Sequence, residues 1–113
     1  MALKAHVGFS TPGISNVGPK IVSHFSKLGY RLVEEHPSEW RFSRGSKASA
    51  LWRFDIRAYA TELIVRTSAD KSGSIWVSCD FNVWTFMNLA TGADVAQLEA
   101  EGRHLESSLR QGP

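Results

Sequence analysis

The alternation of apolar and polar residues over positions 75–83 is the sequence feature that most constrains the fold. Apolar side chains occupy every second position of this segment: Ile75, Val77, Cys79, Phe81 and Val83. Successive side chains of a β-strand point to opposite faces, so this pattern predicts a long strand with one buried face. The polar loop at residues 70–73, with its glycine late, is typical of a hairpin turn before that strand.

Other segments with the same period of two precede this strand, and most are separated by runs that contain Pro, Gly or Ser. The predicted strands are residues 3–9, 30–36, 39–43, 48–57 and 61–67. The connections between successive strands after residue 30 are short, which favours an antiparallel meander over parallel crossovers. We therefore expect four or five antiparallel strands in the part of the chain that follows the first helix.

The first helix is predicted between the strand at residues 3–9 and residue 29. Apolar residues share one face at helical spacing: Val17, Ile21, Phe25 and Leu28. Ser15 or Asn16 can cap its start, and Pro19 is tolerated in the first turn. Gly29 stands where a left-handed residue commonly ends a helix.

The second helix is predicted near the end of the chain, where Thr91 and Asp94 approximate a capping box. Its apolar stripe is narrow: Val95, Leu98, Gly102, Leu105 and Leu109. The charged residues are expected off this stripe: Glu99, Glu101, Arg103 and Glu106. A glycine inside a helix costs about 1 kcal/mol relative to alanine. We therefore expect a bulky side chain, a Trp or Phe from the sheet, to pack against Gly102.

These elements predict an α+β fold with the order β-α-β(4–5)-α. Each strand has one apolar face and both helices are amphipathic, so the simplest packing places both helices on one face of a single curved antiparallel sheet. With 113 residues, the chain has room for one core. We expect residues 1–110 to form a single domain and residues 111–113 to form a frayed tail.

The element order resembles the helix-grip and TATA-binding-protein-like architectures over nearly the whole chain. The resemblance lies in the order of helices and strands and involves no sequence motif. Members of those folds bind sterols, hydrophobic hormones, lipids, nucleic acids or proteins. The resemblance therefore widens the range of functions without selecting one.

Composition excludes several classes of partner and location. The net charge is +2, too small to imply an acidic partner, although residues 1–57 hold nine basic and four acidic side chains. Cys79 is the single cysteine, so no intrachain disulfide forms. The start lacks the long apolar run of a secretory signal, and no stretch approaches the 18 apolar residues of a membrane span. We expect a cytoplasmic protein that does not span a membrane.

No catalytic or metal-binding motif is present. The four histidines, His6, His24, His36 and His104, lack the spacing of a metal site. The glycines of residues 8–13 lie near a strand–helix junction, but Pro12 removes an amide that a phosphate cradle would need. We expect a protein that is not an enzyme and that has no cofactor and no metal.

Basic and aromatic residues alternate in residues 40–57. The basic residues are Arg41, Arg44, Lys47, Arg53 and Arg57. Aromatic platforms beside cations are typical of proteins that bind single-stranded nucleic acid. Strand alternation, however, places Trp52 and Phe54 on the face opposite Arg53 and Arg57. An aromatic core beneath a basic outer face is therefore favoured, and weak nucleic-acid binding ranks third among the functions.

The aromatic residues of positions 40–57, together with Phe81 and residues of the second helix, define a hypothetical pocket between the sheet and that helix. Its lining would be Trp40, Phe42, Trp52, Phe54, Phe81, Leu98, Gly102 and Leu105. A void of 300 Å³ would cost about 7 kcal/mol at roughly 24 cal/mol per Å³. Domains of this size have about 5–15 kcal/mol of stability in total. We expect a packed core, and a carrier of a small apolar ligand is the second functional hypothesis.

A second group of aromatic residues shares the polar face of the strand at residues 75–83: Trp76, Trp84 and Phe86. Large apolar groups on a polar face often mark a contact surface. Alternatively, a β-bulge near Asn82 would turn Trp84 and Phe86 inward. The leading functional hypothesis is a small non-enzymatic binding domain that self-associates through this outer aromatic face.

Overall fold

The protein is described by a computed structural model that covers residues 2–13, 16–45, 60–69, 72–84 and 92–110. Its elements are β1 (Ala2–Pro12), α1 (Val17–Lys27), β2 (Arg31–His36), β3 (Glu39–Arg44), β4 (Thr61–Ala69), β5 (Ser74–Trp84) and α2 (Gly92–Arg110). The strands form one antiparallel sheet in the order β1-β5-β4-β3-β2. The predicted α+β fold with a single antiparallel sheet is confirmed. The predicted strand at residues 48–57 lies outside the described residues.

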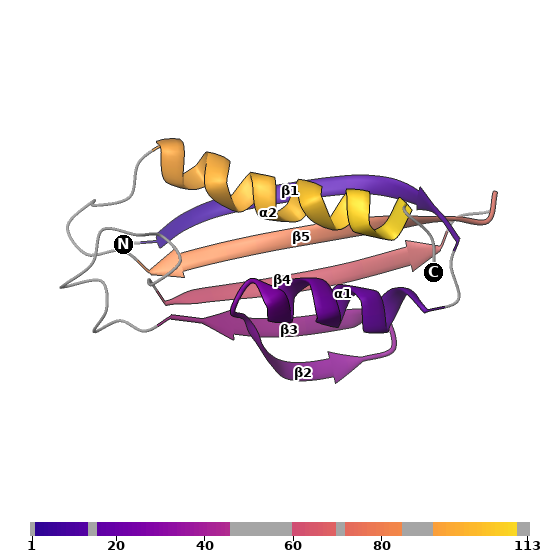
Figure 1. Ribbon diagram of the computed structural model, residues 1–113, viewed down its shortest axis with the longest axis horizontal. Coiled ribbons are helices and arrows are strands. Elements are labelled where there is room, and N and C mark those ends of the chain that lie inside the picture. The colour runs from indigo at the N-terminus through magenta and orange to yellow at the C-terminus, as the bar shows by residue number, and fades with distance from the viewer. Residues whose placement is uncertain (1, 14–15, 46–59, 70–71, 85–91, 111–113) are drawn as a thin grey trace.

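Both helices lie against the same face of the sheet (Figure 1). That inner face carries the buried apolar residues of β1, β3, β4 and β5, as the period of two requires. Phe25 of α1 lies in the middle of the core, with its ring centroid 5.5 Å from Phe42 and 6.4 Å from Phe81. No helix in the described part of the chain is long and apolar enough to cross a membrane.

The first helix ends as predicted, and of its two predicted caps Asn16 does not act as one, whereas Ser15 lies outside the described residues. Gly29 has φ +93°, a conformation that favours glycine, and the Tyr30 amide donates to the Phe25 carbonyl at 3.0 Å. Asn16 occupies the N-cap position, yet its side chain makes no capping hydrogen bond. Helix α1 is stabilised instead by burial of its apolar side chains Ile21 and Phe25 in the core.

The second helix packs on β1, and this corrects the expectation of an aromatic residue opposite Gly102. A Cβ built on Gly102 would lie 2.9 Å from both Cβ and Cγ2 of Val7. The glycine therefore lets the α2 backbone approach an edge strand, whose β-branched Val7 fills the space. Parity on β1 identifies Val7 as an inner-face residue, but only the packing shows that α2 lies over this strand.

Candidate binding surface

In the described part of the chain, the outer face of the sheet, opposite the two helices, is the surface most open to a partner. On β1, β4 and β5 the even-numbered residues point to this face, whereas the odd-numbered residues of β1 and β5 point to the core. Among the described elements, both helices cover the inner face and none covers the outer face (Figure 1). The outer face therefore determines what the described part of the molecule presents to other molecules.

Charged side chains of alternating sign cross this face from β1 to β3. His6 Nδ1 donates to Asp80 Oδ1 at 2.7 Å, and Arg66 Nη1 lies 3.8 Å from Asp80 Oδ2. Arg66 Nε and Arg41 Nε donate to the two oxygens of Glu39 at 2.8 and 3.1 Å. Both hydrogen bonds lower the pKa of the Glu39 carboxyl group, and the one from Arg66 has the larger effect. We call this row of residues the charge ladder.

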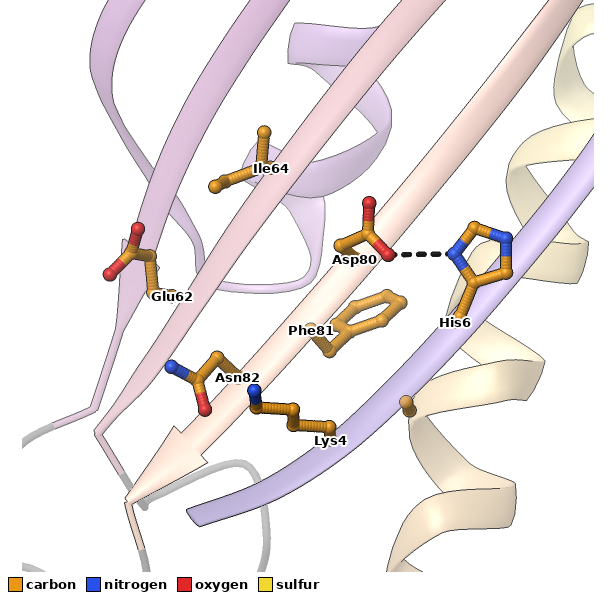
Figure 2. A pocket seen from close by; sticks show the side chains of 8 residues that line it. Lys4, His6, Glu62, Ile64, Asp80, Phe81 and Asn82 are labelled. Carbon is orange, nitrogen blue, oxygen red and sulfur yellow. Dashed lines mark hydrogen bonds and ion pairs between the residues drawn. The ribbon is translucent and has the colours of Figure 1, made fainter.

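A shallow hollow of about 460 Å³ lies on this face between β1, β5 and β4 (Figure 2). Five of its eight lining residues are polar, namely Lys4, His6, Glu62, Asp80 and Asn82, and the other three are Ala5, Ile64 and Phe81. Figure 2 shows the Lys4 side chain directed toward Asn82 and the Asp80 carboxylate directed toward His6. The hollow therefore presents both signs of charge and both donors and acceptors.

The hydrogen bonds around His6 do not activate Ser78 as a nucleophile. Asp80 orients the His6 imidazole through Nδ1, as in many catalytic pairs. Ser78 Oγ, however, donates to Asp80 Oδ2 at 3.3 Å instead of to the imidazole. A serine nucleophile needs the histidine as its base, so this order does not activate the hydroxyl group. Within the described residues, no cluster of His, Cys, Asp or Glu could hold a metal ion.

Trp76 is 47% exposed and belongs to the outer face, as its parity predicts. A Cβ built on Gly8 would lie 2.5 Å from Trp76 Cζ2 and 3.3 Å from His6 Nε2. The missing side chain at Gly8 therefore lets the indole lie across β1, close to His6. Trp76 thus places an exposed aromatic surface over the edge strand.

The other two predicted aromatic residues do not extend this surface. The pairing of β5 with β1 and β4 runs without a register shift through Trp84, so the bulge expected as an alternative near Asn82 is absent. Trp84 is nevertheless partly buried and packs against the core at the end of β5. It lies eight residues from Trp76, about 26 Å along a strand. Phe86 lies outside the described residues.

The predicted basic patch is not assembled as expected. Arg41 lies on the outer face, but carboxylate oxygens of Glu39, Glu34 and Glu62 lie 3.1, 3.5 and 3.9 Å away. Placing Arg44 in this patch was wrong, because it shares the inner face of β3 with Trp40 and Phe42 and is 5% exposed. The other three members lie outside the described residues: Lys47, Arg53 and Arg57.

Arg44 instead forms a buried ion pair with Glu101 of α2. Its Nη1 and Nη2 donate to Glu101 Oε2 and Oε1 at 3.0 and 3.2 Å. The Tyr30 hydroxyl group donates a hydrogen bond to Glu101 Oε1 at 2.9 Å. The centroid of the Tyr30 ring lies 4.1 Å from Arg44 Cζ. Desolvation by burial raises the pKa of the Tyr30 phenol. Glu101, expected off the apolar stripe, is 2% exposed.

The described members of the predicted apolar pocket are core residues. Each of the following is at most 4% exposed: Trp40, Phe42, Phe81, Leu98 and Leu105. Phe25 occupies the space between the sheet residues Phe42 and Phe81. The hollow of Figure 2 lies on the opposite face of the sheet. Trp52 and Phe54 lie outside the described residues.

Comparison of the sequence with models of known protein families and with curated proteins found no match. Inference about function therefore rests on the outer face and on the edges of the sheet.

Proposed function

We propose that this protein is a non-enzymatic binding domain that associates with a second copy of itself through the β1 side of its outer face. The observation that carries the proposal is Trp76, which is 47% exposed and lies across the edge strand at Gly8. Partly exposed tryptophan side chains are enriched at the centres of protein interfaces. Near an edge strand, such a side chain is accessible to a partner that approaches either the face or the edge.

The charges of the outer face support a protein partner over a nucleic acid. Each described arginine of the charge ladder has a carboxylate within 4 Å: Arg41 has Glu39 and Arg66 has Glu39 and Asp80. Binding to a phosphate backbone requires uncompensated positive charge. A mixture of both signs, in contrast, can be complementary to the same mixture on a second copy related by a two-fold axis.

Sedimentation equilibrium of the full chain at micromolar concentrations tests the proposal. We expect a monomer–dimer equilibrium that Trp76→Ser weakens by about tenfold or more, as for a central aromatic residue of an interface. Val33→Ser is the matched control, because Val33 is 63% exposed but lies on β2 at the opposite edge of the sheet. A protein that stays monomeric, or a dimer that both variants weaken equally, would contradict the proposal.

A further inference from the structure

The hydrogen-bond pattern of the sheet shows which backbone groups of β1 face away from it. The Trp84 amide donates to the Ala60 carbonyl at 2.9 Å, so even-numbered residues of β5 turn their backbone groups toward β4. Odd-numbered residues of β5 therefore bond to β1, where they pair with odd-numbered residues. The even-numbered residues of β1 consequently turn their amide and carbonyl groups to the edge of the sheet, where no other described strand pairs with β1. Two details agree with this orientation. Pro12 is an even-numbered residue, and it has no amide group to leave without a partner at the edge. The carbonyl group of Gly8, also even-numbered, accepts a hydrogen bond from Arg103 of α2.

We propose that two copies join their β1 strands antiparallel, with His6 of each copy opposite Gly8 of the other. This inference rests on the self-association proposed above and specifies how it occurs. The two-fold axis would pass beside Val7 and join two five-stranded sheets into one. Backbone hydrogen bonds would supply affinity, as in strand addition at other exposed sheet edges.

Side-chain chemistry and strand overlap select this register from its neighbours. If His6 lay opposite His6, two imidazole groups would face each other. If Gly8 lay opposite Gly8, the two strands would overlap over residues 4–12, whereas the proposed register pairs the whole of Ala2–Pro12. In the proposed register, each His6 imidazole lies opposite a glycine of the other copy and not opposite a second imidazole. Each His6 imidazole would also meet Trp76 of the other copy, which already lies across Gly8.

Arg103 acts in this arrangement as a competitor for the edge. Its Nη1 donates to the Gly8 carbonyl at 3.4 Å, and its side chain is 58% exposed. A second β1 strand must displace this weak, solvent-exposed hydrogen bond. Arg103→Ala is therefore expected to tighten the dimer by roughly two- to fivefold, the range of an exposed charged contact. Lys27→Ala, which removes the same charge from an exposed position on α1, is expected to leave the affinity unchanged.

Disulfide cross-linking tests the register directly. Opposed residues of a hydrogen-bonded antiparallel pair have Cα atoms about 5.5 Å apart, within the range of a disulfide. A mixture of Lys4→Cys and Ser10→Cys proteins should cross-link on oxidation, because residues 4 and 10 are opposed in the proposed register. Cys79 does not interfere, because it is buried and burial raises its pKa to about 12.

Other cross-linking results have different consequences. Cross-linking of His6→Cys alone, or of a mixture of His6→Cys and Ser10→Cys, would identify one of the two rejected registers. Absence of every cross-link in a protein that sediments as a dimer would exclude β1 pairing but leave self-association intact. A monomer would overturn both proposals. Weaker association of Arg103→Ala than of the wild type would exclude the competing role of Arg103.

Discussion

The two edges of the sheet are protected in different ways. β2 is six residues long, its pairing with β3 shifts between Leu32 and Glu34, and all its residues are exposed. Short length, a bulge and charged side chains are common means of blocking strand addition, and β2 carries all three in its own sequence. β1 is eleven residues long and pairs with β5 without a shift. Within the described residues, the edge of β1 is protected by Arg103, which bonds to the Gly8 carbonyl and lies 95 residues after Gly8 in the chain.

This difference shows that one edge is blocked locally, whereas the other depends on the position of a helix. α2 is held by the Arg44–Glu101 ion pair, by the seating of Gly102 on Val7 and by His24, which bonds to the Glu101 carbonyl. Changes to these three contacts should affect β1 and leave the edge at β2 as it is. They therefore test the comparison.

Loss of the buried carboxylate is expected to have the largest effect. Glu101→Leu leaves the Arg44 guanidinium buried and unpaired, which costs about 3–5 kcal/mol of unfolding free energy. The double variant Arg44→Met, Glu101→Leu should recover most of this loss, because no charge then remains buried. Urea denaturation measures both. A single variant that remains within about 1 kcal/mol of the wild type would show that the ion pair does not anchor α2.

Overfilling the contact between α2 and β1 should have an intermediate effect. Gly102→Leu places side-chain atoms where Val7 already lies, so the expected cost is about 1–3 kcal/mol. Hydrogen exchange should become faster in β1 and remain unchanged in β2. Ala96→Leu, at an exposed position of the same helix, is the control. A higher melting temperature for Gly102→Leu, together with loss of apolar-dye uptake, would instead support a ligand pocket.

The contact made by His24 should give the smallest effect, and a pH dependence. Desolvation by burial lowers the pKa of His24 from 6.5, and Nε2 donates to the Glu101 carbonyl at 3.0 Å. At pH values between 6.5 and the lower pKa of His24 in the folded state, the unfolded chain binds more protons than the folded chain. A fall in pH therefore favours unfolding. Stability from this group is complete above pH 6.5 and decreases as the pH falls through the folded-state pKa.

Comparison with His24→Gln isolates this contribution. Glutamine keeps a donor near the Glu101 carbonyl but does not titrate, and the other histidines are common to both proteins. Unfolding free energies at about pH 7.5 and pH 5 should therefore fall further in the wild type than in the variant. Equal decreases in the two proteins would show that His24 contributes nothing to the pH dependence.

Much of the fold was predictable because local patterns report local geometry. The alternation at residues 75–83 predicted β5, and the spacing of Val17, Ile21 and Phe25 predicted α1. The same parity placed Trp76 on the outer face. The candidate surface was only partly predictable, because Trp84 shares that parity and is still partly buried against the core. An even or odd residue number indicates which face of a strand a side chain occupies. It does not indicate whether other residues bury that side chain at the end of the strand.

The Arg44–Glu101 pair illustrates a signal that was present but incomplete. Arg44 has the parity of Trp40 and Phe42, and Glu101 lies three residues after Leu98 and four before Leu105, on the buried face. Each position alone indicates burial of a charge, which is costly unless a partner is present. Which residue is the partner depends on the tertiary structure, because 57 residues separate Arg44 and Glu101 in the chain.

The sequence by itself determined the strands, the helices and the face of each that is apolar, because these depend on spacing within a few residues. Tertiary structure alone decided that α2 lies over β1, that Val7 receives Gly102 and that Gly8 lies beneath Trp76. It also decided that Arg103 reaches the Gly8 carbonyl at the edge of β1. These contacts join residues far apart in the chain, and their geometry follows from how the helices and the sheet pack as whole elements.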